Sequence, residues 1–313
     1  IETSLVNYGF EILIGGRPLP QQSPWTLDLS LSLAMNKDVI AKLPNEARQI
    51  INSDAKIINR LGSNALANYL LVNKGVYATD EDVPVNPATG ERMKAANNKN
   101  NGYVYMQAGD PIWVDVNGDY IIDDKDKVVV GNSQPRLTGG FNANLRYKSF
   151  SINTNFSFTI KRDIINKALA DRFAAYGNPL SKDLNGSGAI TPIEAFDFWK
   201  EDHIYAKYPN PFDYIRGGTA DHQVNFFRPD QTLFMEDGSF LKINGVSISY
   251  VLPKKVLDFL RVERVQLNAS VNNIYTFSKY SGVNPENVNS LGYDVSGGYP
   301  NSRNYTMGVS IDF

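Results

Sequence analysis

The sequence predicts an all-β protein, a transmembrane antiparallel β-barrel. Several segments alternate strictly between apolar and polar residues, as a strand does when successive side chains point to opposite faces. The connections between these segments alternate between short and very long. Short periplasmic turns and long extracellular loops are typical of bacterial outer-membrane barrels, whereas a soluble sandwich predicts no such regularity.

The alternation defines about seven strands, of which the second is the most polarised. From Trp25 to Asn36 it places a row of apolar residues opposite hydroxyls, amides and one acid. Since a leucine row has no use in a wet lumen, we expect its leucines to face lipid. These are Leu27, Leu29, Leu31 and Leu33. The other predicted strands span residues 6–15, 141–148, 150–160, 240–252, 265–277 and 303–313.

Three long connections, at about residues 37–137, 161–237 and 278–302, are predicted to be extracellular loops with short helices. The first is expected to contain a helix near Asn45–Asn52. The second is expected to contain a helix that Asp163 caps, that runs to Tyr176 and that stops at Gly177. A short helical turn is also predicted between Pro253 and Leu260, at a short connection.

The odd number of strands indicates that residues 1–313 are the C-terminal section of a larger barrel. Single-chain bacterial barrels have an even number of strands with both ends in the periplasm. An open sheet in lipid would leave unpaired backbone groups at both edges. We therefore expect the first and last strands to pair with a portion absent here, which would carry a plug domain and the remaining strands.

Composition excludes several classes of protein. The net charge of −2 and the absence of a basic stripe argue against a nucleic-acid partner. The chain has no cysteine, so it has no disulfide framework, thiolate zinc site or cysteine nucleophile. A mean hydropathy of −0.31, without a long apolar run, excludes a transmembrane helix but not a barrel. No secretion signal opens the sequence, and a secreted protein would have lost it.

Five segments resemble a known family. They are Asn7–Glu11, Gly109–Asp119, Asp237–Pro253, Val271–Gly282 and Tyr299–Phe313. In this order they are similar to segments of the SusC/RagA family, the TonB-linked outer-membrane importers of Bacteroidota. The resemblance covers only the C-terminal barrel portion of that family.

That resemblance implies a 22-stranded barrel with a plugged lumen, a class with known examples. It also implies a non-enzymatic chain that helps to import oligosaccharides or peptides. The implied partners are a SusD-like surface lipoprotein, outer-membrane lipid and, through the absent portion, the TonB complex.

One acidic segment has the spacing of a calcium loop. Oxygen-bearing side chains stand at positions 1, 3, 5, 9 and 12 of the loop, as in EF-hand-type sites. They are Asp115, Asn117, Asp119, Asp123 and Asp126. Position 6, usually a glycine at a sharp turn, is Tyr120, whose side chain resists that backbone conformation. A solvated acidic turn is the alternative interpretation.

A second candidate site is the aromatic segment from Phe196 to Tyr214. Its rings could stack on a ligand or pack the loop onto its neighbours. The candidates are Trp199, Tyr205, Tyr208 and Tyr214.

Catalysis has little support. His203 and His222 lie in loop-like sequence and belong to no zinc or nucleophile motif. A soluble β-rich ligand-binding or adhesin module and an outer-membrane hydrolase are the alternatives to an importer. The hydrolase lacks a nucleophile motif.

Overall fold

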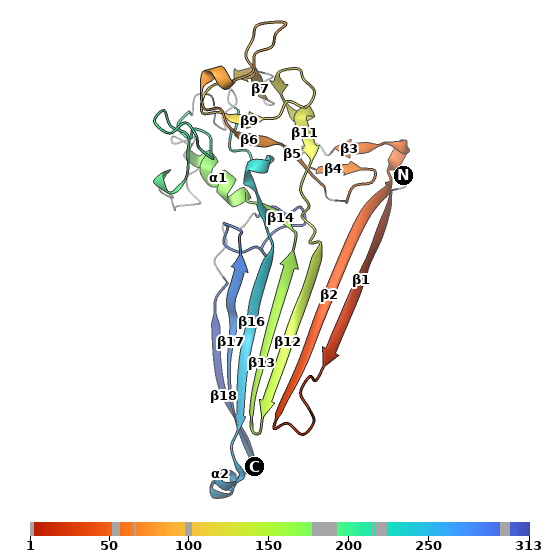
Figure 1. Cartoon of the computed structure of the whole chain (residues 1–313), viewed down its shortest axis with the longest axis vertical. Helices are drawn as coiled ribbons and strands as arrows, with labels where there is room; N and C mark the ends of the chain where they lie inside the picture. The colour runs from red at the N-terminus through yellow and green to blue at the C-terminus, as the bar shows by residue number, and fades with distance from the viewer. Residues whose placement is uncertain are drawn as a thin grey trace.

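In the computed structural model, seven long strands form one antiparallel sheet (Figure 1). The structure describes residues 3–51, 57–65, 67–97, 102–176, 193–213, 216, 224–294 and 301–313. In spatial order the strands are β1 (Ser4–Gly16), β2 (Trp25–Lys42), β12 (Leu137–Tyr147), β13 (Phe150–Ile160), β16 (Phe240–Val251), β17 (Arg264–Ser278) and β18 (Asn304–Asp312). Each strand predicted from alternation is present. Within the described residues β1 and β18 lie at opposite edges, so the sheet is open.

The strand register places apolar residues beside apolar residues across the whole sheet. Leu31 of β2 is level with Ile14 of β1 and Phe141 of β12, and Phe141 is level with Phe156 of β13. On the opposite face, Ser30 is level with Asn142. Because side chains alternate along each strand, one face of the sheet is a continuous apolar band and the other is polar.

Aromatic rings lie at both ends of the apolar band. Trp25 and Tyr147 stack with ring centroids 4.3 Å apart, next to the short turns. At the other end of the sheet, Tyr275 and Phe277 meet edge to face at 4.6 Å. Rings at these two levels are the arrangement expected where a barrel wall meets the two membrane surfaces.

The long connections fold together at one end of the sheet into a body that we call the head (Figure 1). Its strands are β3 (Gln49–Ile51), β4 (Ile57–Arg60), β5 (Ala67–Leu71), β6 (Asn73–Val76), β7 (Lys94–Asn97), β8 (Gly102–Tyr105), β9 (Pro111–Trp113), β10 (Ile121–Ile122), β11 (Lys127–Val129), β14 (Asp163–Ile165) and β15 (Met235–Asp237). Its helices are α1 (Lys167–Tyr176) and the 3-10 turns Pro44–Glu46, Asp80–Asp82, Asp124–Asp126, Ile193–Ala195 and Thr232–Phe234.

The head has hydrophobic cores that draw on more than one connection. Trp113 of the first connection packs with Phe226 of the second. Phe173 of α1 is surrounded by aromatic rings and shares its core with Leu70 of the first connection and Tyr293 of the third. The three connections therefore stabilise one another by burying apolar surface that none could bury alone.

The predicted helix near Asn45–Asn52 is wrong. A single 3-10 turn, Pro44–Glu46, is followed by strand β3, whose residues pair with β4. Asn45 and Glu46 both have a left-handed backbone, with φ of 55°. Such residues end a helix, and the isoleucines that follow favour a strand. Position 52 lies outside the described residues.

The predicted start of the second helix at Asp163 is also wrong. Residues Asp163–Ile165 form strand β14, which pairs with β15, and α1 begins only at Lys167. The cap is Asn166, whose side-chain oxygen accepts a hydrogen bond from the backbone N–H of Leu169 at 3.0 Å. Gly177, the predicted stop, lies outside the described residues.

The other helix, α2 (Lys254–Leu260), joins β16 to β17 at the end of the sheet opposite the head. It confirms the helical turn predicted after Pro253. In the described part of the chain, no helix has the length and apolar composition needed to cross a bilayer.

Candidate functional site

The motif that begins at Gly109 holds the first and second connections together. Gly109 has a φ of +85°, which favours glycine, and a Cβ there would lie 2.9 Å from the Trp199 ring. The backbone N–H of Asn210 also donates to the Gly109 carbonyl at 2.8 Å. A side chain at position 109 would therefore push the second connection away.

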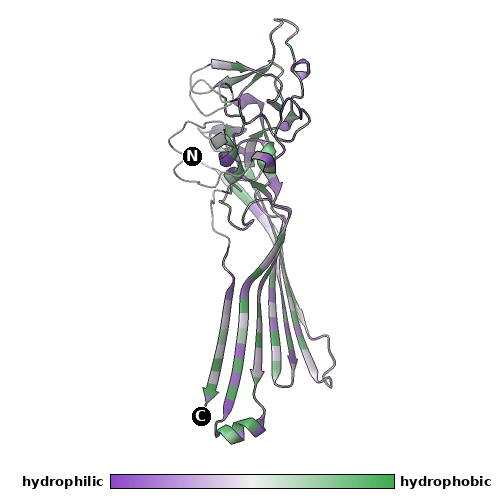
Figure 2. Cartoon of the chain, turned by 90° about the vertical axis from the view of Figure 1, so that its left-hand side faces the viewer, coloured by the Kyte–Doolittle hydropathy of each residue, from purple (hydrophilic) through white to green (hydrophobic). Residues whose placement is uncertain are grey.

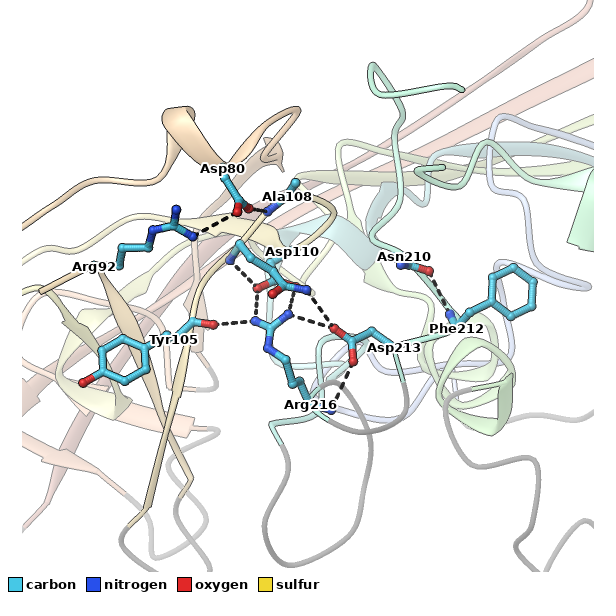
Figure 3. Close-up of polar contacts among 10 residues, drawn as sticks. Asp80, Arg92, Tyr105, Ala108, Asp110, Asn210, Phe212, Asp213 and Arg216 are labelled. Atoms are coloured by element: carbon cyan, nitrogen blue, oxygen red, sulfur yellow. Dashed lines mark hydrogen bonds and ion pairs between the residues drawn. The ribbon is translucent and has the colours of Figure 1, made fainter. Parts of the chain in front are cut away.

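Asp110, the next residue, forms a buried ion pair with Arg216 (Figure 3). The same guanidinium bonds to Asp213 at 2.8 Å and donates to the backbone carbonyl of Tyr105. Burial raises the pKa of Asp110 to about 6, while Arg216 opposes that rise. At neutral pH the pair is therefore charged, and it ties the two connections together at a second point.

Further polar contacts, drawn in Figure 3, hold the chain just before Gly109 and Asp110. Asp80 accepts a hydrogen bond from the backbone N–H of Ala108 at 2.8 Å and pairs with Arg92 at 3.1 Å. These donors, the Ala108 N–H first, hold the pKa of Asp80 below its ordinary value.

Buried side chains continue the contact between the connections. The Trp113 ring nitrogen donates to the Gln231 side chain at 2.7 Å, and the Gln231 amide donates to the Phe226 carbonyl at 2.7 Å. Each of these polar groups is thereby satisfied inside the core.

An ion cluster lies deeper, around Asp230. Its carboxylate pairs with Arg228 at 2.6 Å and with Lys127 of β11 at 2.8 Å, and Lys127 also reaches Asp124 at 2.8 Å. Burial alone would raise the pKa of Asp230, but the two cations hold it well below its ordinary value. The cluster joins the second connection to the first by charge, and its central pair, Lys127 and Asp230, is buried.

In the predicted calcium loop, the acidic and amide side chains bind the loop's own backbone. Asp115 accepts from the N–H groups of Gly118 and Tyr120 at 2.7 and 2.8 Å. Asp119 accepts from that of Ile121 at 2.8 Å. Tyr120 has a φ of +62°, so it takes the left-handed conformation expected of a glycine at position 6. The backbone therefore makes the turn at this position although the residue is a tyrosine.

The acidic side chains at the end of the loop, Asp123 and Asp126, also bind backbone N–H groups. Asp126 is fully buried and accepts from the N–H groups of Val116 and Asp123 at 2.9 and 2.8 Å. Asp123 caps the following turn by accepting from Lys125 N–H at 2.6 Å. As these side chains stand, no three acidic or histidine groups in the described residues lie where one metal ion could bind them.

Of the four candidate ligand-stacking aromatics, two lie inside the head. Tyr208 packs edge to face on Phe173, and the nearly buried Trp199 donates its ring N–H to the Ala78 carbonyl at 3.2 Å. Tyr205 is 83% exposed. Tyr214 lies outside the described residues. Accordingly, only Tyr205 of the described candidates offers a ring to a ligand.

Sequence reasoning missed an exposed pair on β8. Tyr103 and Tyr105 are both about half exposed, and the Lys94 ammonium lies 4.9 and 5.6 Å from the two ring centroids. The signal was present as two tyrosines spaced by one residue in a short strand, since residues i and i+2 share a face. These rings form a second surface on which a ligand could stack.

His203 bonds to Asp197 at 2.6 Å on the surface of the head. His222 lies outside the described residues.

Comparison with known proteins identifies the class. No family model matches the sequence. The TonB-dependent receptor P3 of Formosa agariphila is 26% identical over 330 residues, which cover 99% of this chain and 29% of that protein. The TonB-dependent receptor SusC of Bacteroides thetaiotaomicron is 25% identical over 323 residues, which cover 99% of this chain and 26% of that protein.

Solved structures agree on the fold. The RagAB peptide transporter superposes with a TM-score of 0.69 at 20% identity, over 99% of this chain and 30% of that one. Its importer form in the open-open state superposes with a TM-score of 0.67 at 19% identity, again over 99% of this chain and over 29% of that one. This chain therefore spans less than a third of the length of the relatives that it matches.

The two-faced sheet and these relatives define the class, a section of an outer-membrane β-barrel. More particularly, the chain is similar in sequence to TonB-dependent receptors, SusC among them, and similar in fold to a section of the RagAB transporter. The two-faced sheet and this likeness place the chain in the outer membrane, and these relatives are named as receptors and transporters rather than as enzymes.

Proposed function

We propose that this chain is the C-terminal wall of a TonB-dependent importer that brings oligosaccharides or peptides through the outer membrane. The observation that carries the proposal is the sheet, whose apolar band suits lipid and whose polar face suits a wet lumen. The head then lies outside the cell and the short turns lie in the periplasm.

The two edges of the sheet support a larger assembly. In the described residues β1 pairs only with β2, and β18 pairs only with β17. In hydrocarbon each unpaired backbone group costs several kcal/mol. We therefore propose that the rest of the same transporter, with its plug and its contact with TonB, pairs with both edges.

The head is the part that would meet ligand and lid. Its exposed rings, Tyr205, Tyr103 and Tyr105, are suited to the faces of sugars or to peptide side chains. Since one relative by structure is named a peptide transporter and one by sequence is named SusC, we propose a SusD-like lipoprotein as the partner over this surface.

Affinity purification tests this proposal. A tag on the full-length transporter should bring down a surface lipoprotein from detergent-extracted outer membranes. Cells that lack the transporter, or whose proton-motive force is collapsed, should lose uptake of the matching oligosaccharide or peptide. Uptake that persists without the proton-motive force, or extraction without detergent, would contradict the proposal.

We also propose that the loop from Asp115 to Asp126 binds calcium. The left-handed backbone of Tyr120 and its N–H bond to Asp115 favour this, because EF-hand-type loops turn sharply at the same position. Binding would require the acidic side chains of the loop to converge on the ion, because no three acidic groups of the described residues now lie close enough together to hold one.

Limited proteolysis provides the measurement. Calcium should slow cleavage of this loop relative to a chelator or magnesium, and Asp119→Ala should remove the difference. Asp171→Ala, an exposed acid on α1, should leave it unchanged. Equal cleavage of the unaltered protein with calcium and with chelator would remove the site.

A further inference from the structure

Helix α2, between β16 and β17, presents apolar side chains to its surroundings. Phe259 is 86% exposed, and Val256 and Leu260 are also exposed. Residues three and four apart lie on one side of a helix, so these three side chains form one apolar face. Lys255 and Asp258, also three apart, share a different and polar side.

The position of α2 relates this face to the apolar band. The backbone N–H of Leu252 donates to the Val265 carbonyl at 2.9 Å. The connection that carries α2 therefore begins and ends at apolar residues next to the ends of β16 and β17. Val265 is only 6% exposed, although Leu267, Tyr275 and Phe277 of the same strand and face are exposed. Val265 is level with Ile311 of β18 and bonded to Leu252, so it lies where the sheet meets the connection that carries α2. The connection therefore continues directly from the end of the apolar band.

The direction of α2 differs from that of the strands. Its axis runs across the strand ends rather than along them (Figure 2). Strands that cross a bilayer end near its surface, so a helix that runs across their ends is placed to lie at the interface rather than to cross the bilayer.

Charge around α2 is mainly positive. This short segment has four basic residues and two acidic ones. The basic residues are Lys254, Lys255, Arg261 and Arg264, and the acidic ones are Asp258 and Glu263. No ion pair is found for Lys254, Lys255 or Arg261 within the described part of the chain. Cations beside an apolar face are the pattern of helices that lie in the interface of an anionic membrane.

We infer that α2 is an interfacial anchor whose Val256, Phe259 and Leu260 insert among phospholipids of the leaflet opposite the head, while its lysines and Arg261 meet the phosphates. Three features support lipid as the occupant: continuity with the apolar band, the direction of the helix and the positive charge. On the proposed orientation of the barrel, this leaflet is the periplasmic one. The anchor would fix the depth of the β16–β17 hairpin in the membrane.

Spin-label accessibility tests the inference in the full-length transporter reconstituted in phosphatidylethanolamine and phosphatidylglycerol vesicles. This chain has no cysteine, so a nitroxide can be placed through Phe259→Cys. Its collisions with oxygen, which concentrates in the bilayer, should exceed those with a water-soluble nickel chelate several-fold. Asp258→Cys, the matched control on the polar side, should show the reverse, and Leu267→Cys in the band is the lipid-facing reference.

Two results would overturn the inference. More frequent collision with nickel at position 259 would place the helix in water. Protection from both reagents with an immobile spectrum would show that protein covers it. Should Phe259→Cys fail to assemble as a barrel, Val256→Cys reports on the same apolar face with the same readings.

Discussion

Asp230→Asn should loosen the head by about 3 kcal/mol, because it leaves the buried Lys127 and the partly buried Arg228 with only the more exposed Asp124 as a carboxylate partner. Arg228 and Lys127 both pair with Asp230, and the Lys127 side chain is only 1% exposed. Asparagine keeps the shape of the side chain but removes its charge. The effect is measurable as faster hydrogen exchange in the segment around Leu71, whose backbone N–H donates to the Asp230 carbonyl at 3.0 Å.

The control for that change is Asp171→Asn on α1. It breaks an ion pair with Lys167 in which both side chains are substantially exposed, and such pairs contribute about 0–1 kcal/mol. Exchange near Leu71 should then match that of the unaltered protein. Equal exchange rates in Asp230→Asn and Asp171→Asn would mean that the cluster does not hold the connections together.

The pH dependence of this cluster follows from the depressed pKa of Asp230. A carboxylate whose pKa is lower in the folded state stabilises the fold fully above its unfolded pKa, near 3.8. That stabilisation is lost only as the pH falls through the lower, folded value. The contribution of Asp230 to the head should therefore be constant from pH 8 to pH 5 and should decline in stronger acid.

Sequence alone predicts the barrel wall well because its physics is local. Side chains of a strand alternate between its two faces. With lipid on one face and water on the other, strands such as β2 and β13 need apolar and polar residues in alternation. The register then follows, since a slip of one residue would turn leucines such as Leu31 to the lumen.

The secondary structure of the head is harder to predict from the sequence, because it is stabilised by contacts between residues that are distant in sequence. Residues Gln49–Ile51 pair with β4, and Asp163 belongs to a strand because it pairs with Asp237 of β15. Propensity is a weak guide where tertiary pairing decides.

The candidate sites divide in the same way. The spacing of the acidic loop is visible in sequence, but the amide partners of Asp115 and Asp126 are not. Trp199 and Tyr205 are both aromatic residues of one segment and equally good candidates from the sequence. In the structure Trp199 packs on Gly109, whereas Tyr205 is exposed. Which ring is exposed depends on contacts with the neighbouring connection. The sequence around each ring does not reveal those contacts.

Leu29→Arg should destabilise the membrane-embedded barrel by about 2–4 kcal/mol, the cost of a cation on the lipid face near the bilayer midplane. Leu29 lies near the middle of the apolar row of β2, level with Ala143 of β12 and Gly16 of β1. An arginine there must either lose its hydration or distort the lipid around it. Denaturant unfolding of the full-length transporter in phospholipid vesicles gives the free energy.

The matched change is Ser30→Arg, one residue further along the same strand. Ser30 is level with Asn142 on the polar face, where a guanidinium keeps access to water and to other polar groups. We expect a loss well below that of Leu29→Arg, although the two variants add the same side chain to neighbouring positions. The difference between them isolates the direction of each side chain from the effect of size and charge. Equal tolerance of both variants would show that the leucine row does not face lipid, and a larger loss for Ser30→Arg would mean that the two faces of the sheet are assigned the wrong way round.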